Sequence, residues 1–266
     1  MLLLLLSRLF LFLLFISLIE SFLMGTGAHG QPKKMPKQEI PSGLDLVYYD
    51  NGLGSLWYEP VKKSDSKGDY LLVCFLDQGE SFSTNQKNIR VLESLYPYHV
   101  IIYLENPGLG FSYEVMAFSD EERVQELKIA YECILRYKSW TKIIWTGYGW
   151  GAKAQSILYP LCRQDQIKMP EFILHLNGAP TNATSNGREE YDSLSCPLFI
   201  IHSRHNKIYS FMDSVLLHQK LRPHSTLLLL YGQHNTCLLS KENKELLEKT
   251  ILELNSKQPK EVIFFK

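Results

Sequence analysis

The sequence lacks an excess of charge of either sign. Its 266 residues carry 28 Lys and Arg against 28 Asp and Glu. A dedicated nucleic-acid-binding protein usually shows a basic excess on at least one face. The balance therefore predicts that no nucleic acid is a partner of this protein.

Cysteine is scarce and scattered. The chain has five cysteines and no C-x-x-C spacing. This composition excludes a disulfide framework and a zinc site built from thiolates. Three histidines, His202, His205 and His234, form an alternative set of metal ligands near the end of the chain. No carboxylate completes a shell around them, so we expect neither a metal nor a cofactor.

Long apolar runs are confined to the amino terminus. Within residues 1–24, the uncharged run Leu9–Ile19 has eleven residues. This length suits the apolar core of a signal peptide, about 7–15 residues, better than a spanning helix, which needs about 20. Small residues follow at Gly25 and Ala28, where a peptidase could cut. We expect residues 1–30 to direct the chain to the secretory pathway or to secretion.

A membrane anchor is the alternative for the same segment. Lys33, Lys34 and Lys37 follow it, and such a basic flank favours a cytoplasmic body held at the membrane by residues 1–24. Prolines at three positions in residues 31–43 indicate a linker. The remaining residues, 44–266, are predicted to form one domain.

The body alternates short apolar runs with segments of helical periodicity. Runs such as Tyr70–Leu76 and His99–Leu104 are apolar throughout, as in strands buried on both faces. A hairpin is predicted around Asn51-Gly52, and Ser119 to Glu122 has the form of a helix capping box. Further strands are predicted at 142–146, 172–176, 197–202 and 226–231, and helices at 85–96, 152–162, 211–221 and 241–254. This alternation predicts an α/β fold with a mostly parallel sheet covered by helices on both faces.

The chemistry of such folds gathers at the carboxyl ends of the strands. One strand runs directly into Gly147-Tyr148-Gly149-Trp150-Gly151 and then into a helix. This is the G-x-S-x-G spacing of a nucleophile elbow in its strand–turn–helix context, except that Gly149 stands at the serine position. A glycine-rich turn with no catalytic history is the simpler alternative for this segment alone.

Four more segments fall at other predicted strand ends, in a consistent order. They are Asp77-Gln78-Gly79, Pro107–Ser112, Cys196–Asn206 with the sequence CPLFIIHSRHN, and Gly232-Gln233-His234. Together with the elbow they resemble the α/β-hydrolase superfamily over residues 44–256. The resemblance is strongest to its lid-less, serine aminopeptidase-type branch of depalmitoylase-like and monoacylglycerol-lipase-like serine hydrolases, in which the late strand reads CPxxxIHGxxDxxI.

The resemblance implies a Ser–Asp–His triad at positions 149, 206 and 234, of which only His234 is retained. Gly149 has no side chain to attack a substrate, and Asn206 tends to orient the histidine in the wrong tautomer. The oxyanion positions are Gln78, Gly79 and Trp150, and Asp77 brings a carboxylate beside them that would repel a developing oxyanion.

These departures predict a catalytically impaired protein, a pseudo-serine hydrolase. It would keep a pocket for an acyl or lipid ligand or for a protein partner. The alternative is an active ester or thioester hydrolase with unusual machinery centred on His234, so the sequence leaves open whether the protein is an enzyme. Residues 180–195 are too few for a large lid, which predicts an open site. If only catalytic groups are missing, Gly149→Ser with Asn206→Asp should restore turnover.

Overall fold

The computed structural model describes residues 39–60, 69–78, 81–112, 119–178, 194–222 and 224–256, with side chains up to residue 251. The predicted signal segment, most of the linker and residues 180–193 lie outside these ranges. All the described residues belong to one compact unit, residues 35–266. Within the described ranges, no helix combines the length and apolarity needed to cross a bilayer.

The core of the fold is a sheet of eight strands in the order β1-β2-β4-β3-β5-β6-β7-β8. The strands are β1 (Asp45–Tyr48), β2 (Gly54–Tyr58), β3 (Tyr70–Phe75), β4 (His99–Leu104), β5 (Lys142–Tyr148), β6 (Phe172–Leu176), β7 (Leu198–Ser203) and β8 (Ser225–Leu230). The β1–β2 and β2–β4 pairs are antiparallel. All the other pairs are parallel, as the apolar runs predicted.

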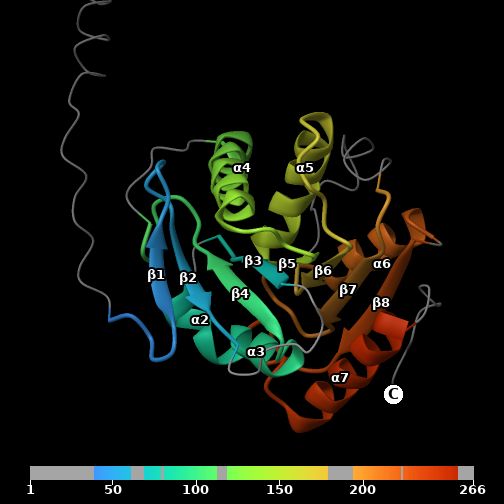
Figure 1. The fold of residues 1–266 in the computed structure, drawn as a ribbon. Helices are drawn as coiled ribbons and strands as arrows, with labels where there is room; N and C mark the ends of the chain where they lie inside the picture. Colours follow the sequence, from blue (N-terminus) through green and yellow to red (C-terminus); the bar gives the residue numbers. More distant parts are fainter. Residues whose placement is uncertain are drawn as a thin grey trace, which may run out of the picture. The chain divides into compact units, whose positions relative to one another are not determined.

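Helices cover both faces of the sheet (Figure 1). They are α2 (Phe82–Ile89), α3 (Val91–Leu95), α4 (Asp120–Tyr137), α5 (Trp150–Gln164), α6 (Phe211–Lys220) and α7 (Lys241–Ser256). The capping box at the start of α4 is confirmed, because Ser119 and Glu122 each bond the backbone N–H of the other. The single helix predicted over residues 85–96 is wrong: Arg90 ends α2 and starts α3, and α2 begins earlier.

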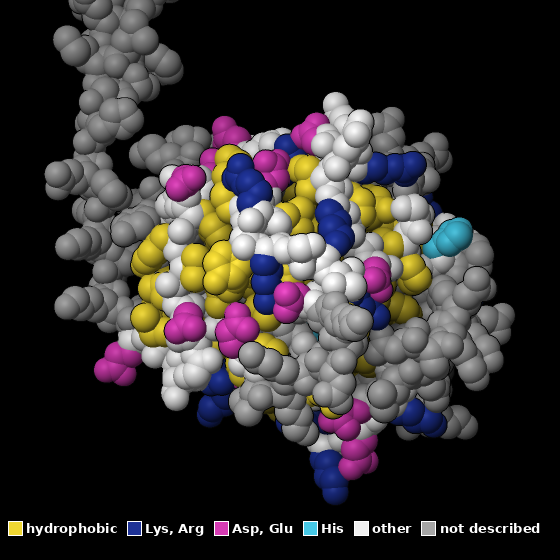
Figure 2. Space-filling model, viewed as in Figure 1, with side chains coloured by type: hydrophobic (Ala, Val, Ile, Leu, Met, Phe, Trp, Pro, Cys, Tyr) yellow, Lys and Arg dark blue, Asp and Glu magenta, His cyan; other side chains and the backbone are white. Residues whose placement is uncertain are grey.

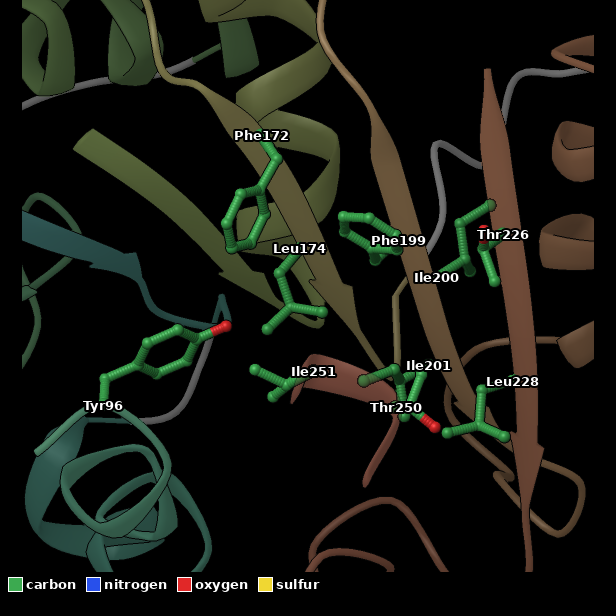
Figure 3. A pocket seen from close by; sticks show the side chains of 10 residues that line it. All are labelled: Tyr96, Phe172, Leu174, Phe199, Ile200, Ile201, Thr226, Leu228, Thr250 and Ile251. Atoms are coloured by element: carbon green, nitrogen blue, oxygen red, sulfur yellow. The ribbon is translucent and has the colours of Figure 1, made fainter. Parts of the chain in front are cut away.

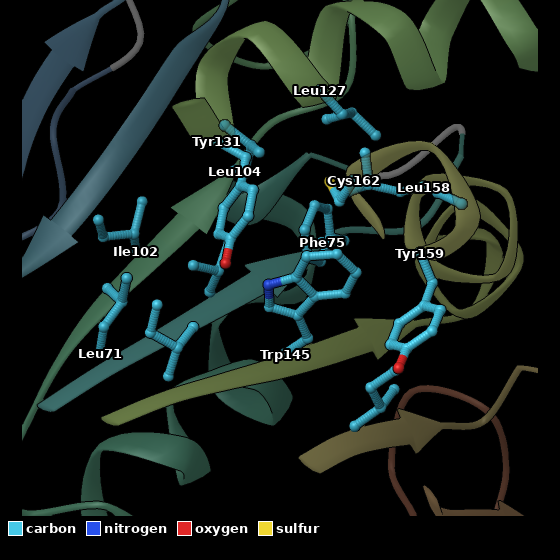
Figure 4. Close-up of a cluster of buried hydrophobic side chains, with 14 of the residues drawn as sticks. Leu71, Phe75, Ile102, Leu104, Leu127, Tyr131, Trp145, Leu158, Tyr159 and Cys162 are labelled. Carbon is cyan, nitrogen blue, oxygen red and sulfur yellow. The ribbon is translucent and has the colours of Figure 1, made fainter. Parts of the chain in front are cut away.

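Two hydrophobic clusters lie on opposite faces of the sheet. Alternate residues of β3 divide between them, because successive strand side chains point to opposite faces: Val73 and Phe75 join one cluster, and Cys74 joins the other. In the first cluster Trp145 packs edge-on against Phe75 and Tyr131, with ring centroids 5.5 and 5.1 Å apart (Figure 4). The members of both clusters all lie between residues 44 and 251, so the described core belongs entirely to the compact unit.

Hydrophobic side chains also gather on the surface formed by β1, β2 and α4 (Figure 2). An open groove there is lined by Val47, Tyr48, Tyr49, Asp50, Trp57, Cys133, Arg136 and Tyr137. Tyr137 packs edge-on against Trp57 and is 68% exposed.

Candidate functional site: a hydrolase-like centre

The sharp turn between β5 and α5 requires its glycines. An added Cβ at Gly151 would lie 2.0 Å from the carbonyl oxygen of Phe75, and one at Gly147 would lie 2.6 Å from the backbone nitrogen of Ala152. Gly149 has a φ of 54° and a ψ of −117°. The glycine pattern therefore reflects close backbone packing of α5 on the sheet, as expected of a nucleophile elbow.

The apex of this turn faces the Asp77 side chain. A Cβ added to Gly149 would lie 2.2 Å from the Asp77 carboxyl carbon and 2.3–2.4 Å from the two carboxyl oxygens. The Asp77 carboxylate thus occupies the space into which a serine at position 149 would extend. The described centre is therefore filled: Asp77 is 3% exposed and His234 is 4% exposed. The prediction of an open site was based on residues 180–195, most of which lie outside the described residues.

Three donors bind one oxygen of the Asp77 carboxylate. Oδ1 accepts hydrogen bonds from the backbone N–H of Trp150 (2.5 Å) and of Gln78 (2.8 Å). These two N–H groups stand at the positions that the sequence assigned to the oxyanion hole. The hydroxyl of Tyr209 donates to the same oxygen at 2.6 Å. The donors at the predicted oxyanion positions therefore hold a carboxylate of the chain itself.

His234 lies between the other Asp77 oxygen and Asn206. Its Nε2 is 3.1 Å from Asp77 Oδ2, and its Nδ1 is 3.0 Å from Asn206 Nδ2. The orientation of the Asn206 amide follows from its oxygen, which accepts from the backbone N–H groups of Ile208 and Tyr209 at 2.9 and 3.1 Å.

This arrangement determines the tautomer of His234. Asn206 presents an N–H to Nδ1, so Nδ1 must accept and Nε2 must carry the proton, which it donates to Asp77. A serine hydrolase needs the opposite tautomer, because Nε2 has to take the proton of the attacking hydroxyl. The side chains at positions 206 and 234 therefore lie within hydrogen-bond distance, and the bond between them runs in the direction opposite to that of the acid–histidine bond in a triad.

Buried amides and a tyrosine hold the surrounding loops. Asn177 and the hydroxyl of Tyr148 both donate to the carbonyl oxygen of His234, at 2.8 and 2.7 Å. Asn106 donates to the carbonyl oxygens of Leu76 and Asp77 at 3.0 and 2.7 Å. These bonds hold the His234 loop at the ends of β5 and β6, and the Asp77 loop beside the end of β4.

The structure brings together most of the predicted site residues. Gly149, Asn206, His234, Gln78 and Trp150 meet around Asp77, while Gly79 lies outside the described residues. Trp150 is buried in the core, and its indole N–H donates to Asp120 at 3.0 Å.

Sequence reasoning missed Tyr209 and the direction in which Asp77 points. A signal did exist in the residue types: position 149 is a glycine, and the facing loop carries a carboxylate at Asp77.

The three histidines considered as metal ligands do not converge. His202 is buried, and its two ring nitrogens lie 2.7 Å from Ser214 Oγ and 3.1 Å from the carbonyl oxygen of Tyr209. Burial lowers the pKa of His202 to about 4. His205 is exposed, and its ring lies tilted beside that of Tyr231, with the centroids 5.9 Å apart. In the described part of the chain, no group of three potential ligands could hold a metal ion.

A narrow apolar hollow lies elsewhere, between the sheet and α7 (Figure 3). Its walls include Phe172, Phe199 and Thr226, which lie near the amino ends of β6, β7 and β8, and Ile251 from α7. The triad positions lie at the opposite, carboxyl ends of the strands. The hollow is therefore not part of the hydrolase-like centre.

Comparison with known proteins finds the fold among solved structures only. No family model matches the chain, and no curated protein matches it. The chain is similar to Est1E of Butyrivibrio proteoclasticus, solved with ferulic acid bound, with a TM-score of 0.64 and 12% identity over 80% of this chain and 98% of that one. An α/β serine hydrolase homologue of Coxiella burnetii gives 0.60 and 13%, over 82% and 99% of the two chains.

A lid-less α/β serine hydrolase of Xanthomonas campestris is also similar, with a TM-score of 0.58 and 13% identity over 82% of this chain and 95% of that one. At these identities the likeness concerns the fold alone. Together with the strand order, it shows that the described chain has the α/β-hydrolase fold in a single domain.

Proposed function

We propose that this protein is a pseudo-serine hydrolase, an α/β-hydrolase-like protein of the lid-less branch that acts by binding rather than by catalysis. The observation that carries the proposal is the Asp77 carboxylate. It fills both the oxyanion site, through the N–H groups of Gln78 and Trp150, and the space of the missing nucleophile. A substrate carbonyl has no free donor to polarise it while Asp77 stays in place.

The tautomer of His234 supports the same proposal. An alternative hydrolase that uses His234 and water needs a lone pair on Nε2 to take a proton from the water. The Asn206 amide donates a hydrogen bond to Nδ1 of His234, and Nε2 carries the proton, which it donates to Asp77. Nε2 therefore has no lone pair to offer to a water molecule. Loss of the catalytic acid in a triad typically lowers the rate by about 10⁴-fold, and here the nucleophile is absent as well.

The binding partner is proposed to be an acyl or lipid ligand or another protein. The filled centre favours contact at the rim of the former active site over insertion of an acyl carbonyl into it, because the oxyanion donors are already occupied. We also propose that residues 1–24 place the protein in the secretory pathway or anchor it to a membrane.

A substitution series tests the loss of catalysis. Residues 35–266 contain the whole described core and serve for the assay with short-chain esters and thioesters. We expect no turnover above buffer for the wild type. The pair Gly149→Ser and Asn206→Asp should also stay inactive, because the new serine would collide with the Asp77 carboxylate.

Adding Asp77→Ala to that pair frees the oxyanion donors and makes room for the serine. We expect measurable hydrolysis from this triple variant, and its loss when His234→Ala is added. Wild-type turnover that disappears in His234→Ala would instead establish an active hydrolase. A folded but inactive triple variant would contradict the proposed geometry, and circular dichroism checks the folding of each variant.

A further inference from the structure

Exposed aliphatic side chains form a ridge along α6 and the turn before it. Ile208, Met212 and Leu216 are 59%, 48% and 42% exposed. They follow one another at intervals of four residues, so Met212 and Leu216 lie on the same face of the helix. The opposite face of α6 is anchored, because Leu217 is buried in the core cluster and Phe211 packs against it. We call Ile208, Met212 and Leu216 the α6 ridge.

Positive charge flanks the α6 ridge along the chain. Residues 204–224 contain Arg204, Lys207, Lys220 and Arg222, with Asp213 as their one acidic residue, a net charge of +3 in a chain that is neutral overall. Lys207 precedes the ridge, while Lys220 and Arg222 follow it, and these three cations are exposed. Apolar side chains with cations at both ends match a surface that is apolar and carries negative charge.

The other apolar surface patch has no such preference. The groove below α4 contains Asp50 and Arg136, one charge of each sign. The charges that line this groove therefore favour neither an acidic nor a basic binding partner, whereas the net positive charge near the α6 ridge favours a negatively charged one.

We propose that the α6 ridge binds an anionic lipid surface. Aliphatic side chains on the convex face of a helix can enter the boundary between lipid headgroups and acyl chains, while flanking Lys and Arg side chains reach the phosphates. Each cation near an anionic membrane adds to the affinity, which makes the binding dependent on salt. A protein partner fits less well, because a convex ridge offers no pocket to enclose an anchoring side chain.

The α6 ridge begins on the loop that contributes to the hydrolase-like centre. The backbone N–H of Ile208 donates to Asn206, and the hydroxyl of the next residue, Tyr209, donates to Asp77. A membrane bound at the ridge would therefore lie against the rim of the former active site. The inference does not depend on the loss of catalysis, since it rests on a surface outside the triad positions.

Vesicle binding by residues 35–266 tests the inference without the apolar amino terminus. The probes are phosphatidylcholine vesicles with and without phosphatidylserine, in a sedimentation assay. We expect the wild type to bind only the vesicles that contain phosphatidylserine, and to be released by salt. Leu216→Glu should weaken this binding by about tenfold or more, because it removes an inserting side chain and adds a repelled charge.

Matched controls separate the α6 ridge from general surface effects. Ile129→Glu changes an aliphatic residue of nearly equal exposure, 41%, on α4 and should leave binding unchanged. Lys207→Glu should weaken binding, whereas Lys87→Glu, on exposed α2 surface, should not. Thermal melts confirm that each variant is folded.

Two results would overturn the inference. One is the absence of wild-type binding to phosphatidylserine vesicles, including the case in which an acidic protein binds the ridge instead. The other is an equal loss of binding in Leu216→Glu and Ile129→Glu, which would show that the vesicles recognise overall charge rather than the ridge.

Discussion

Replacing Asp77 with alanine tests whether the filled oxyanion site stabilises the fold. The carboxylate accepts hydrogen bonds from two backbone N–H groups, from Tyr209 and from His234, and it is 3% exposed. Leaving a buried donor unpaired costs about 1–3 kcal/mol. Leaving the two backbone donors unpaired would therefore lower the free energy of unfolding by about 2–6 kcal/mol. A water molecule that enters the vacated space would reduce this loss. We expect Asp77→Ala to lower the free energy of unfolding by about 3 kcal/mol.

Urea unfolding of residues 35–266, followed by circular dichroism, measures this change. The control is Asp69→Ala, which removes a largely exposed carboxylate paired with Lys138 and should cost less than about 1 kcal/mol. A small carboxylate gives a second readout: formate should raise the melting temperature of Asp77→Gly, by filling the vacated site, and leave the wild type unchanged. An Asp77→Ala variant as stable as the wild type, or more stable, would refute the reasoning, because the donors would then have no need of the carboxylate.

Three further predictions concern stability. Burial raises the pKa of Glu105 to about 8, so the contribution of this residue to stability is full below about pH 4.5 and is lost as the pH rises through 8. In urea unfolding, the free energy of unfolding of Glu105→Gln should match that of the wild type at pH 5 and exceed it by about 2–4 kcal/mol at pH 8.5. Parallel pH profiles of the two proteins would contradict this. Gly151→Ala should cost about 3 kcal/mol or more, because its Cβ would collide with the Phe75 carbonyl; calorimetry tests it, and an unchanged melting temperature would show that the turn can relax. Ser119→Ala should cost about 1 kcal/mol through loss of the capping box, measured by urea unfolding, and a loss below experimental error would mean that the cap adds nothing.

The Asp77 carboxylate links two features of the proposed pseudo-hydrolase centre. It fills the space beside Gly149, which has no side chain, and it accepts the hydrogen bonds of the Gln78 and Trp150 N–H groups. Gly149 and Asp77 are thus sterically coupled. Replacing Gly149 with serine alone creates a collision, and removing Asp77 alone leaves unpaired buried donors, so we expect neither single change to produce hydrolysis.

The α/β architecture could be predicted from the sequence because it depends on local patterns. Continuous apolar runs such as Leu71–Phe75 indicate strands buried on both faces, and the glycines at 147 and 151 indicate the tight turn that follows β5. The order of the segments also assigned positions 149, 206 and 234 to one edge of the sheet, where the structure brings them together.

The direction of the hydrogen bonds at that edge was decided only by the tertiary structure. Asp77 and His234 are separated by 157 positions in the chain, and Tyr209 reaches Asp77 from a third loop. A sequence shows which donors and acceptors are available, whereas their pairing depends on where the folded backbone places each atom. The sequence therefore determined that Gly149 and Asn206 stand at the predicted nucleophile and acid positions, and the tertiary structure determined that the Asp77 carboxylate fills the space beside Gly149.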